Sequence, residues 1–212
     1  MAAGYDGVSA WIERFASVVE AERSHLTQLD SAIGDGDHGT NMHRGMQTAL
    51  ERSRAAGEGD IGALLQAVGM ALISKVGGAA GPLYGSFFLQ FSGPCKGRSE
   101  LSPEEWGEAL AAGVASVQAR GKAEPGDKTM LDALLPAAEA YRSALGGGDG
   151  FEAALRRSAE AAEEGMRATI PLVARKGRAS YLGERSRDHQ DPGATSSYLL
   201  LQAAADALSD NA

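Results

Sequence analysis

The chain has 212 residues, 43% hydrophobic and 23% charged, with a single cysteine, Cys95. This composition predicts a folded protein and excludes wholesale disorder, an internal disulfide and a cysteine zinc site. The net charge of −8 argues against a nucleic-acid-binding protein. Charged residues close to the N-terminus and the lack of a long apolar run predict a cytoplasmic protein without signal peptide or membrane span.

Hydrophobic residues recur at three- and four-residue spacing through most of the chain, which predicts helices. Glycine, proline and capping residues divide the sequence into eight predicted helices, 7–29, 39–55, 59–76, 82–95, 102–120, 128–145, 149–176 and 192–209. Only Phe87–Phe91 could be read as a short strand, and the glycine-rich run 146–150 is interpreted as a hairpin between antiparallel helices. The predicted fold is all-α, a single-domain antiparallel eight-helix bundle over residues 1–212.

The first connection, 30–41, places the carboxylates of Asp30, Asp35 and Asp37 within eight residues. Such charges repel one another unless a cation lies among them, and carboxylate oxygens suit Mg²⁺ or Ca²⁺. The glycines at 34, 36 and 39 let the backbone curl so that these side chains converge. The spacing of these glycines also fits a dinucleotide fingerprint, but it follows a helix instead of a strand. The alternative, a solvated turn with two helix N-caps, stays open at this point.

Two further connections are rich in glycine. Residues 77–81 precede Pro82, and permissive residues before a helix N-terminus expose amides that can bind an anion. Close helix packing with a C-cap glycine is the equally weighted alternative. The segment 121–130 nearly spells a P-loop, but Asp127 intrudes between glycine and lysine, and no strand precedes it. We interpret Asp127 as the N-cap of the helix over 128–145.

The longest stretch without a helical pattern, 174–198, carries five lysines and arginines in an acidic chain. Loops of this length are usually functional or mobile, although a solvated charged loop is an even alternative. Asp191 followed by Pro192 predicts the start of the last helix.

These four connections are the first, third, fifth and seventh of the predicted bundle. Alternate connections of an antiparallel bundle lie at the same end, so carboxylates, amide donors and arginines should gather on one rim. A rim of this type is expected to bind a metal–polyphosphate, and phosphoryl transfer needs little beyond positioning and charge neutralisation.

Four long motifs in the same order cover the chain and resemble the L subunit of dihydroxyacetone kinase: GDGDHGTNMHRG, GGAAGPLYG, RGKAEPGDKTMLD and ARKGRASYLGERSRDHQDPGATS. The resemblance implies an eight-helix barrel with the nucleotide at one rim. It also implies two Mg²⁺ held by Asp30, Asp35 and Asp37, which would be the catalytic residues. The ADP or ATP contacts that it implies are His38, Gly39, Thr40, Asn41, Ala79, Ala80, Gly121, Met130, Arg178, Asp191, Pro192 and Gly193. The chain departs from the family pattern at Ala80, where a serine is usual, which places any serine-dependent step in doubt.

The resemblance further implies that ADP is kept as a cofactor and recharged to ATP by a phosphocarrier (M-type) subunit. The phosphoryl group then passes to dihydroxyacetone held by a partner K subunit. Two alternatives stay open: a free-standing kinase module that exchanges ATP, acting on dihydroxyacetone or another substrate, and a nucleotide-dependent co-regulator of a transcription factor. The oligomeric state, a homodimer included, also stays open.

Overall fold

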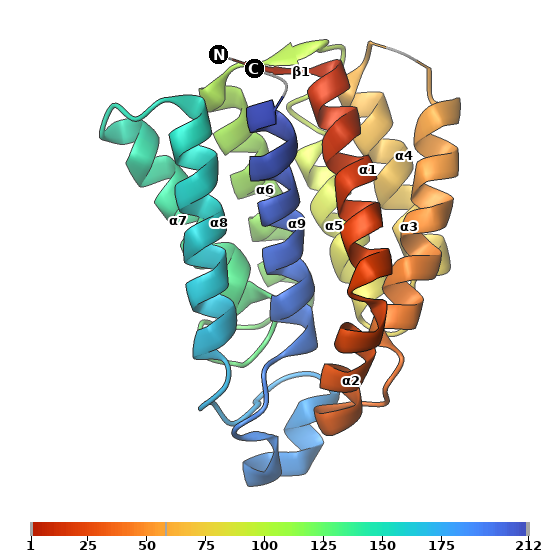
Figure 1. Ribbon diagram of the computed structural model, residues 1–212, viewed down its shortest axis with the longest axis vertical. Helices are drawn as coiled ribbons and strands as arrows, with labels where there is room; N and C mark the ends of the chain where they lie inside the picture. Colours follow the sequence, from red (N-terminus) through yellow and green to blue (C-terminus); the bar gives the residue numbers. More distant parts are fainter. Residues whose placement is uncertain (1, 58, 211–212) are drawn as a thin grey trace.

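The computed structural model describes residues 2–57 and 59–210 and shows an all-α architecture (Figure 1). The helices are α1 (Tyr5–Ala21), α2 (Arg23–Ile33), α3 (His38–Ala55), α4 (Ile61–Lys75), α5 (Ala80–Phe91), α6 (Pro103–Gly121), α7 (Leu131–Gly146), α8 (Phe151–Ala168), the 3-10 helix η1 (Arg178–Ser186) and α9 (Pro192–Asp210). The two-residue strands β1 (Ala3–Gly4) and β2 (Glu100–Leu101) pair antiparallel. No helix in these ranges is long and apolar enough to cross a membrane.

The helices form a closed ring. Each of α3 to α8 packs against the next helix along the chain, and α9 returns to pack against α1, which closes the barrel (Figure 1). The helix α2 follows α1 after a break at Glu22 and packs against α3. The prediction of an all-α antiparallel bundle is confirmed, and so is the hairpin, because α7 and α8 pack together across the run 146–150.

Three boundary predictions are wrong. The helix expected over 7–29 breaks at Glu22 and then continues to Ile33. The helix expected over 149–176 ends at Ala168, since Pro171 disfavours helical geometry at the residue before it. The helix expected over 82–95 ends at Phe91, and Phe87–Phe91 forms its last part, as that prediction requires, and not a strand. The capping box at Ser102 agrees with the predicted start of α6, because the Ser102 and Glu105 side chains each accept the other's backbone N–H.

One end of the barrel is filled by large rings, and we call it the aromatic end. Trp11 and Trp106 are both almost fully buried, with ring centroids 5.1 Å apart. The cluster comprises Trp11, Phe88, Phe91, Trp106, Tyr141 and Phe151. Since Phe91 ends α5 and Phe151 begins α8, the opposite ends of these helices point to the other mouth of the barrel.

Candidate functional site

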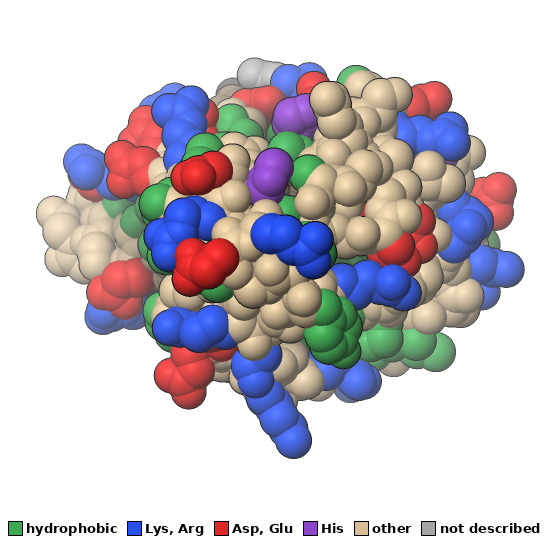
Figure 2. Space-filling model, turned by 90° about the horizontal axis from the view of Figure 1, so that it is seen from below, with side chains coloured by type: hydrophobic (Ala, Val, Ile, Leu, Met, Phe, Trp, Pro, Cys, Tyr) green, Lys and Arg blue, Asp and Glu red, His purple; other side chains and the backbone are tan. Residues whose placement is uncertain are grey.

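The second mouth of the barrel, which we call the cavity end, holds a cavity of about 810 Å³. All four connections singled out in the sequence line it, as the alternation of helix direction predicts. Lining residues include Asp30 to Asn41 in part, Gly77 to Ala80, Gly121 and Lys128 to Leu131, Arg175 to Tyr181, and Asp191 to Gly193. Viewed from this end, the surface carries many Lys and Arg side chains with Asp and Glu between them, although the chain is acidic overall (Figure 2).

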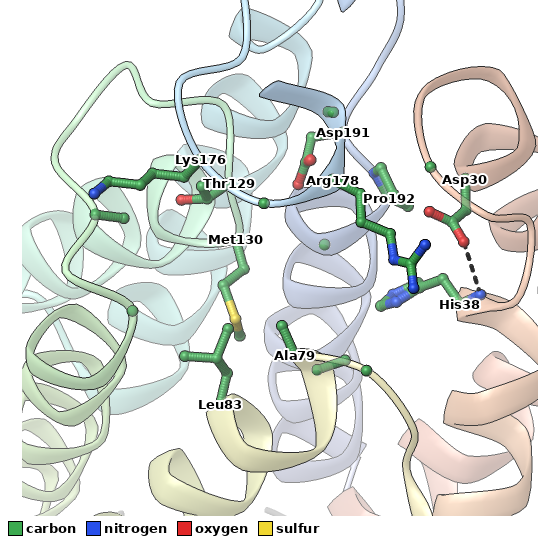
Figure 3. Close-up of a pocket in the computed structure, with 18 of the residues that line it drawn as sticks. Asp30, His38, Ala79, Leu83, Thr129, Met130, Lys176, Arg178, Asp191 and Pro192 are labelled. Carbon is green, nitrogen blue, oxygen red and sulfur yellow. Dashed lines mark hydrogen bonds between the residues drawn. The ribbon is translucent and has the colours of Figure 1, made fainter. Parts of the chain in front are cut away.

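The cavity has a polar and an apolar side. Asp30, His38 and Arg178 converge on one side, and the side chains of Leu83 and Met130 face each other on the other (Figure 3). A cavity divided in this way can hold a ligand that is charged at one end and flat or apolar at the other.

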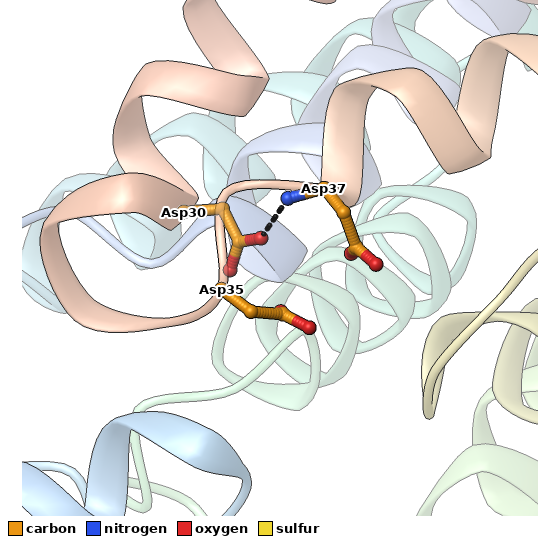
Figure 4. Close-up of side chains that lie close together, drawn as sticks. All are labelled: Asp30, Asp35 and Asp37. Carbon is orange, nitrogen blue, oxygen red and sulfur yellow. Dashed lines mark hydrogen bonds between the residues drawn. The ribbon is translucent and has the colours of Figure 1, made fainter.

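Asp30, Asp35 and Asp37 each bring a carboxylate oxygen to within 4.8 Å of the others (Figure 4). Asp30 is buried and is held by its own loop, since its Oδ2 accepts the N–H of Asp37 at 2.8 Å and of His38 at 3.1 Å. This all-oxygen donor set fits a hard divalent ion such as Mg²⁺. Among the residues that the structure describes, this is the only group of three or more acidic, histidine or cysteine side chains with such spacing.

Glycines permit the tight turn that carries these carboxylates. Gly36 has φ +73°, and a Cβ added at Gly34 would lie 2.1 Å from the Asp30 side chain. Gly39 packs so closely on α2 that a Cβ there would lie 2.1 Å from the Arg23 carbonyl. The three glycines noted in the sequence are therefore required by geometry.

His38, at the start of α3, is held in place by a network of buried hydroxyl groups on α5 and α9. Its Nε2 lies 2.9 Å from Ser196 Oγ, which lies 2.7 Å from the hydroxyl of Tyr84, and Ser197 is 3.0 Å from the same hydroxyl. Burial lowers the pKa of His38, against the opposing effect of Asp30 and Asp37, and raises the pKa of Tyr84 to about 12. The network fixes the imidazole beside the aspartates, and burial favours its neutral form. Sequence reasoning did not find Tyr84 or Ser196, whose hydroxyls carry no local pattern.

The glycine connection leads directly into the N-terminus of α5 at the cavity. Gly78 has φ +65°, a conformation that favours glycine, and a Cβ on Gly81 would lie 2.3 Å from the Val76 carbonyl. Ala79 and Ala80 begin the helix and line the cavity. Both expected features are present, namely close packing and a helix N-terminus directed at the site, which suits an anion.

The interpretation of Asp127 as a helix N-cap is wrong. The helix α7 begins at Leu131, and it is Asp132 whose carboxylate accepts the N–H groups of Gly126 and Thr129. Asp127 instead accepts the Nε of Arg175 at 2.7 Å. Its neighbour Lys128 is buried, a position that the near-match to a P-loop did not reveal.

Part of the basic segment forms the 3-10 helix η1, and the segment closes one side of the cavity. Arg178 lies 3.1 Å from the Asp35 carboxylate, so the loop is joined to the aspartate cluster by an ion pair. Asp191 caps α9 as predicted, since its Oδ2 accepts the N–H of Ala194 at 2.7 Å. Burial raises the pKa of Asp191 to about 7.

The structure brings most of the predicted site residues to the cavity. Its lining includes Asp30, Asp35, Asp37, His38, Asn41, Ala79, Ala80, Gly121, Met130, Arg178, Asp191, Pro192 and Gly193. Gly39 and Thr40 lie outside the lining, in the first turn of α3.

Comparison with known proteins places this arrangement in context. Residues 32–206 match the model of the DAK2 domain family. The chain is 45% identical to the ADP-binding subunit DhaL of the PEP-dependent dihydroxyacetone kinase of Escherichia coli, over 91% of both chains. It is 38% identical to the corresponding subunit of the PTS-dependent kinase of Lactococcus lactis, over 93% of this chain and 94% of the relative.

A solved structure supports the fold. The crystal structure of the dihydroxyacetone kinase from C. freundii in complex with AMP-PNP and Mg²⁺ superposes with a TM-score of 0.70 at 24% identity. The match covers 94% of this chain and 33% of that one, so the present chain spans about a third of that kinase.

Proposed function

The chain belongs to the DAK2 domain family, within the group of dihydroxyacetone kinase L subunits, and on this premise we propose that it is a nucleotide- and magnesium-binding phosphotransfer subunit. In this role it passes a phosphoryl group from its nucleotide to dihydroxyacetone bound on a K subunit. A phosphocarrier of the M type would recharge the ADP in place. The names of the relatives support a kinase, an ADP-binding role and a PEP- or PTS-dependent donor.

The observation that carries this proposal is the meeting of three carboxylates, a helix N-terminus and Arg178 at one cavity. Asp30, Asp35 and Asp37 would hold two Mg²⁺, which when bound neutralise phosphate charge and polarise the phosphoryl oxygens. The donor set fits this use, since it offers only oxygens and Asp30 is oriented by two backbone amides.

We assign the nucleotide to the two sides of the cavity. The base would lie on the side of Leu83 and Met130, and the phosphates would lie by the N-terminus of α5 and the aspartates. The amides of Ala79 and Ala80 would donate to phosphate oxygens, and Arg178 would exchange its present partner Asp35 for a phosphate. His38, Gly39, Thr40, Asn41, Gly121 and Asp191 to Gly193 complete the proposed contact set. Since catalysis of phosphoryl transfer is mainly positioning and charge neutralisation, these residues need no additional general base.

Reconstitution tests the proposal. The purified chain would be combined with a K subunit and dihydroxyacetone and supplied either with a phosphorylated carrier or with ATP, and the phosphorylated product would be measured. With the phosphorylated carrier as donor, we expect more product than the amount of ADP present. We also expect ADP to stay bound to the protein through desalting. Absence of product with both donors would contradict the proposed function.

Two other results would favour the alternatives. Product from ATP alone, with rapid exchange of nucleotide, would indicate an ATP-exchanging kinase module. Selective capture of a transcription factor by either the ADP- or the ATP-loaded form, without transfer, would indicate a co-regulator. The proposed subunit is a single domain over 1–212 that works in the cytoplasm.

A further inference from the structure

Lys128 is a buried cation at the edge of the cavity. Its side chain is among the largest fully buried ones, with 1% of the residue exposed, and its backbone takes a left-handed conformation with φ +64°. Its Nζ contacts four backbone carbonyl oxygens: Thr169 at 2.9 Å, Ile170 at 3.3 Å, Leu172 at 3.0 Å and His189 at 2.5 Å.

These acceptors come from two places that are distant along the chain. Three follow the end of α8 directly, and the fourth lies just before α9. The ammonium group therefore joins the two ends of the loop 173–188, and we call this junction the neck of the loop. Two further bonds close the same neck: Asp188 N–H donates to the Ile170 carbonyl at 2.8 Å, and Asp191 N–H to Thr169 Oγ1 at 3.0 Å.

The loop above this neck supplies one wall of the cavity. Arg175, Lys176, Arg178 and Tyr181 all line the cavity, and all four lie on this loop. Beyond the neck, the loop contacts the barrel at a few places: Ala179 and Leu182 pack on Ile33 of α2, Arg175 bonds Asp127, and Arg178 pairs with Asp35. The exposed ion pair of Arg178 contributes little stability by itself, so the placement of Arg178 depends on how firmly the rest of the loop, the neck included, is held.

We propose that Lys128 is a positioning residue that fixes the neck of the loop 173–188 and thereby holds Arg178 over the bound nucleotide, slowing its release. The inference rests on the proposed function, since it assigns to this lysine the retention of ADP at the same site. The bonds of the Lys128 ammonium group go to backbone carbonyl oxygens, so the role proposed for it is positioning and not contact with the metal or the phosphates.

The chemistry of the side chain supports this role. A lysine ammonium carries three N–H donors and no acceptor, so it can satisfy several carbonyls that converge on one point. Arginine has a planar fork and would match this geometry less well. Methionine, of similar length, would remove this donor from all four carbonyls, of which, within the described ranges, only those of Thr169 and Ile170 also accept a backbone N–H, from Leu172 and Asp188. The loss favours opening of the neck to water.

The test compares Lys128→Met with Lys122→Met. Lys122 lies in the same connection and also has a left-handed backbone, with φ +49°, but its side chain is exposed, so it is a matched control. For K128M we expect ADP to dissociate about tenfold faster or more, equivalent to about 1.4 kcal/mol. We also expect faster trypsin cleavage after the basic residues of the loop, with K122M within about twofold of wild type in both measurements.

A second readout separates positioning from loss of stability. The affinity of the aspartates for Mn²⁺ alone should be unchanged or tighter in K128M, because Arg178 is then released from Asp35, and Lys128→Arg should restore part of the slow dissociation. A general weakening of the fold would reduce Mn²⁺ affinity together with ADP affinity, and that result would overturn the proposal. So would ADP release and loop cleavage in K128M equal to those in K122M.

Hydrogen exchange of the wild-type protein provides a test if K128M does not fold. The amides of Asp188 and Asp191, which close the neck, should exchange much more slowly than the amide of Tyr181 in the loop. Equal exchange would contradict a fixed neck. Failure of the wild-type chain to bind ADP would instead refute the proposed function, while the cleavage and exchange measurements would still decide the role of Lys128.

Discussion

The two ends of the barrel are built from the same helices but contain opposite kinds of residue, aromatic at one end and charged or glycine at the other. At the aromatic end, Trp11 and Trp106 pack in a cluster of rings that fills the space between the helices. At the cavity end, the same helices begin or end in glycines, carboxylates and arginines, and they leave a cavity of about 810 Å³. Burial of large rings is the main source of stability in such a fold, whereas charges gathered around a cavity oppose it.

This contrast indicates a division of labour along each helix. The helix α5, for example, begins at Ala80 in the cavity and ends at Phe91 among the rings. One end can then be changed for its effect on ligands, and the other for its effect on folding. The following predictions test this separation, from the largest expected effect to the smallest.

Asp35→Ala should cause the largest change at the cavity end. The loss of one of three carboxylates should reduce phosphoryl transfer on the order of a hundredfold or more, because the proposed metal would lose a direct ligand. Far-UV circular dichroism and the melting temperature should stay near those of wild type, since Asp35 is exposed. Transfer is measured in the reconstituted system and Mn²⁺ binding by calorimetry. Wild-type turnover in D35A would contradict the metal assignment.

Trp106→Ala should have the converse effect. Removing this buried ring should destabilise the protein by about 3–5 kcal/mol, because the cluster cannot close the space left behind. Below its lowered melting temperature, the variant should still bind ADP with nearly wild-type affinity. Urea denaturation and calorimetry at 15 °C would check the two halves of this prediction, roughly at the temperature of maximum stability. A loss of ADP affinity in the folded variant would show that the two ends are coupled.

Asp191→Asn should have a smaller effect that depends on pH. The pKa of Asp191 is raised from 3.8 to about 7 in the folded chain, so the folded state binds this proton more tightly than the unfolded chain. The associated stability is complete below pH 3.8 and is lost as the pH rises to 7, at about 1.4 kcal/mol per pH unit at most. Asparagine retains the helix cap but does not titrate. The melting temperature of D191N relative to wild type should therefore rise between pH 5 and 7 and then level off, and a constant difference would refute the assignment.

Ala80→Ser should have the smallest effect. It introduces the hydroxyl that the sequence resemblance implies at this position and adds at most one hydrogen bond to a phosphate, while the backbone amide at residue 80 is present in both forms. We expect ADP to bind about two- to tenfold more tightly, the net value of one hydrogen bond. Calorimetric titration with ADP checks this, with Ser74→Ala, a change in the exposed part of α4, as a comparison. A gain in turnover far above the gain in affinity would show that the hydroxyl takes part in transfer.

Periodicity was sufficient to predict the helices and their common end. The spacing of the apolar residues determines which face of each helix is buried, and the alternation of helix direction predicts that Asp30, Ala79 and Arg178 lie at the same end, as they do. The boundaries that failed depend on local competition. Pro171 ended α8 early. Asp127 accepts the N–H of Glu124 and Asp132 accepts those of Gly126 and Thr129, so both carboxylates bond amides of the connection and neither occupies the N-cap position, which is Met130.

The residues that could not be predicted are those whose role depends on distant partners. Lys128 bonds carbonyls more than 40 positions away, and Ser196 joins His38 to Tyr84 across three helices. Such contacts leave no period and no motif, because a lysine or a serine has the same local preferences whether it is buried or exposed. Only the fold shows which of the two lysines in the connection 121–130 is buried.

The short ladder of β1 with β2 and the end of α9 lie together at the aromatic end, as far as the barrel allows from the cavity (Figure 1). A tag, tether or covalently linked neighbour attached there would leave the cavity open. Immobilisation of the protein through either terminus on a sensor surface should thus present the site outward, and fusion to a second protein should be tolerated without redesign of the barrel.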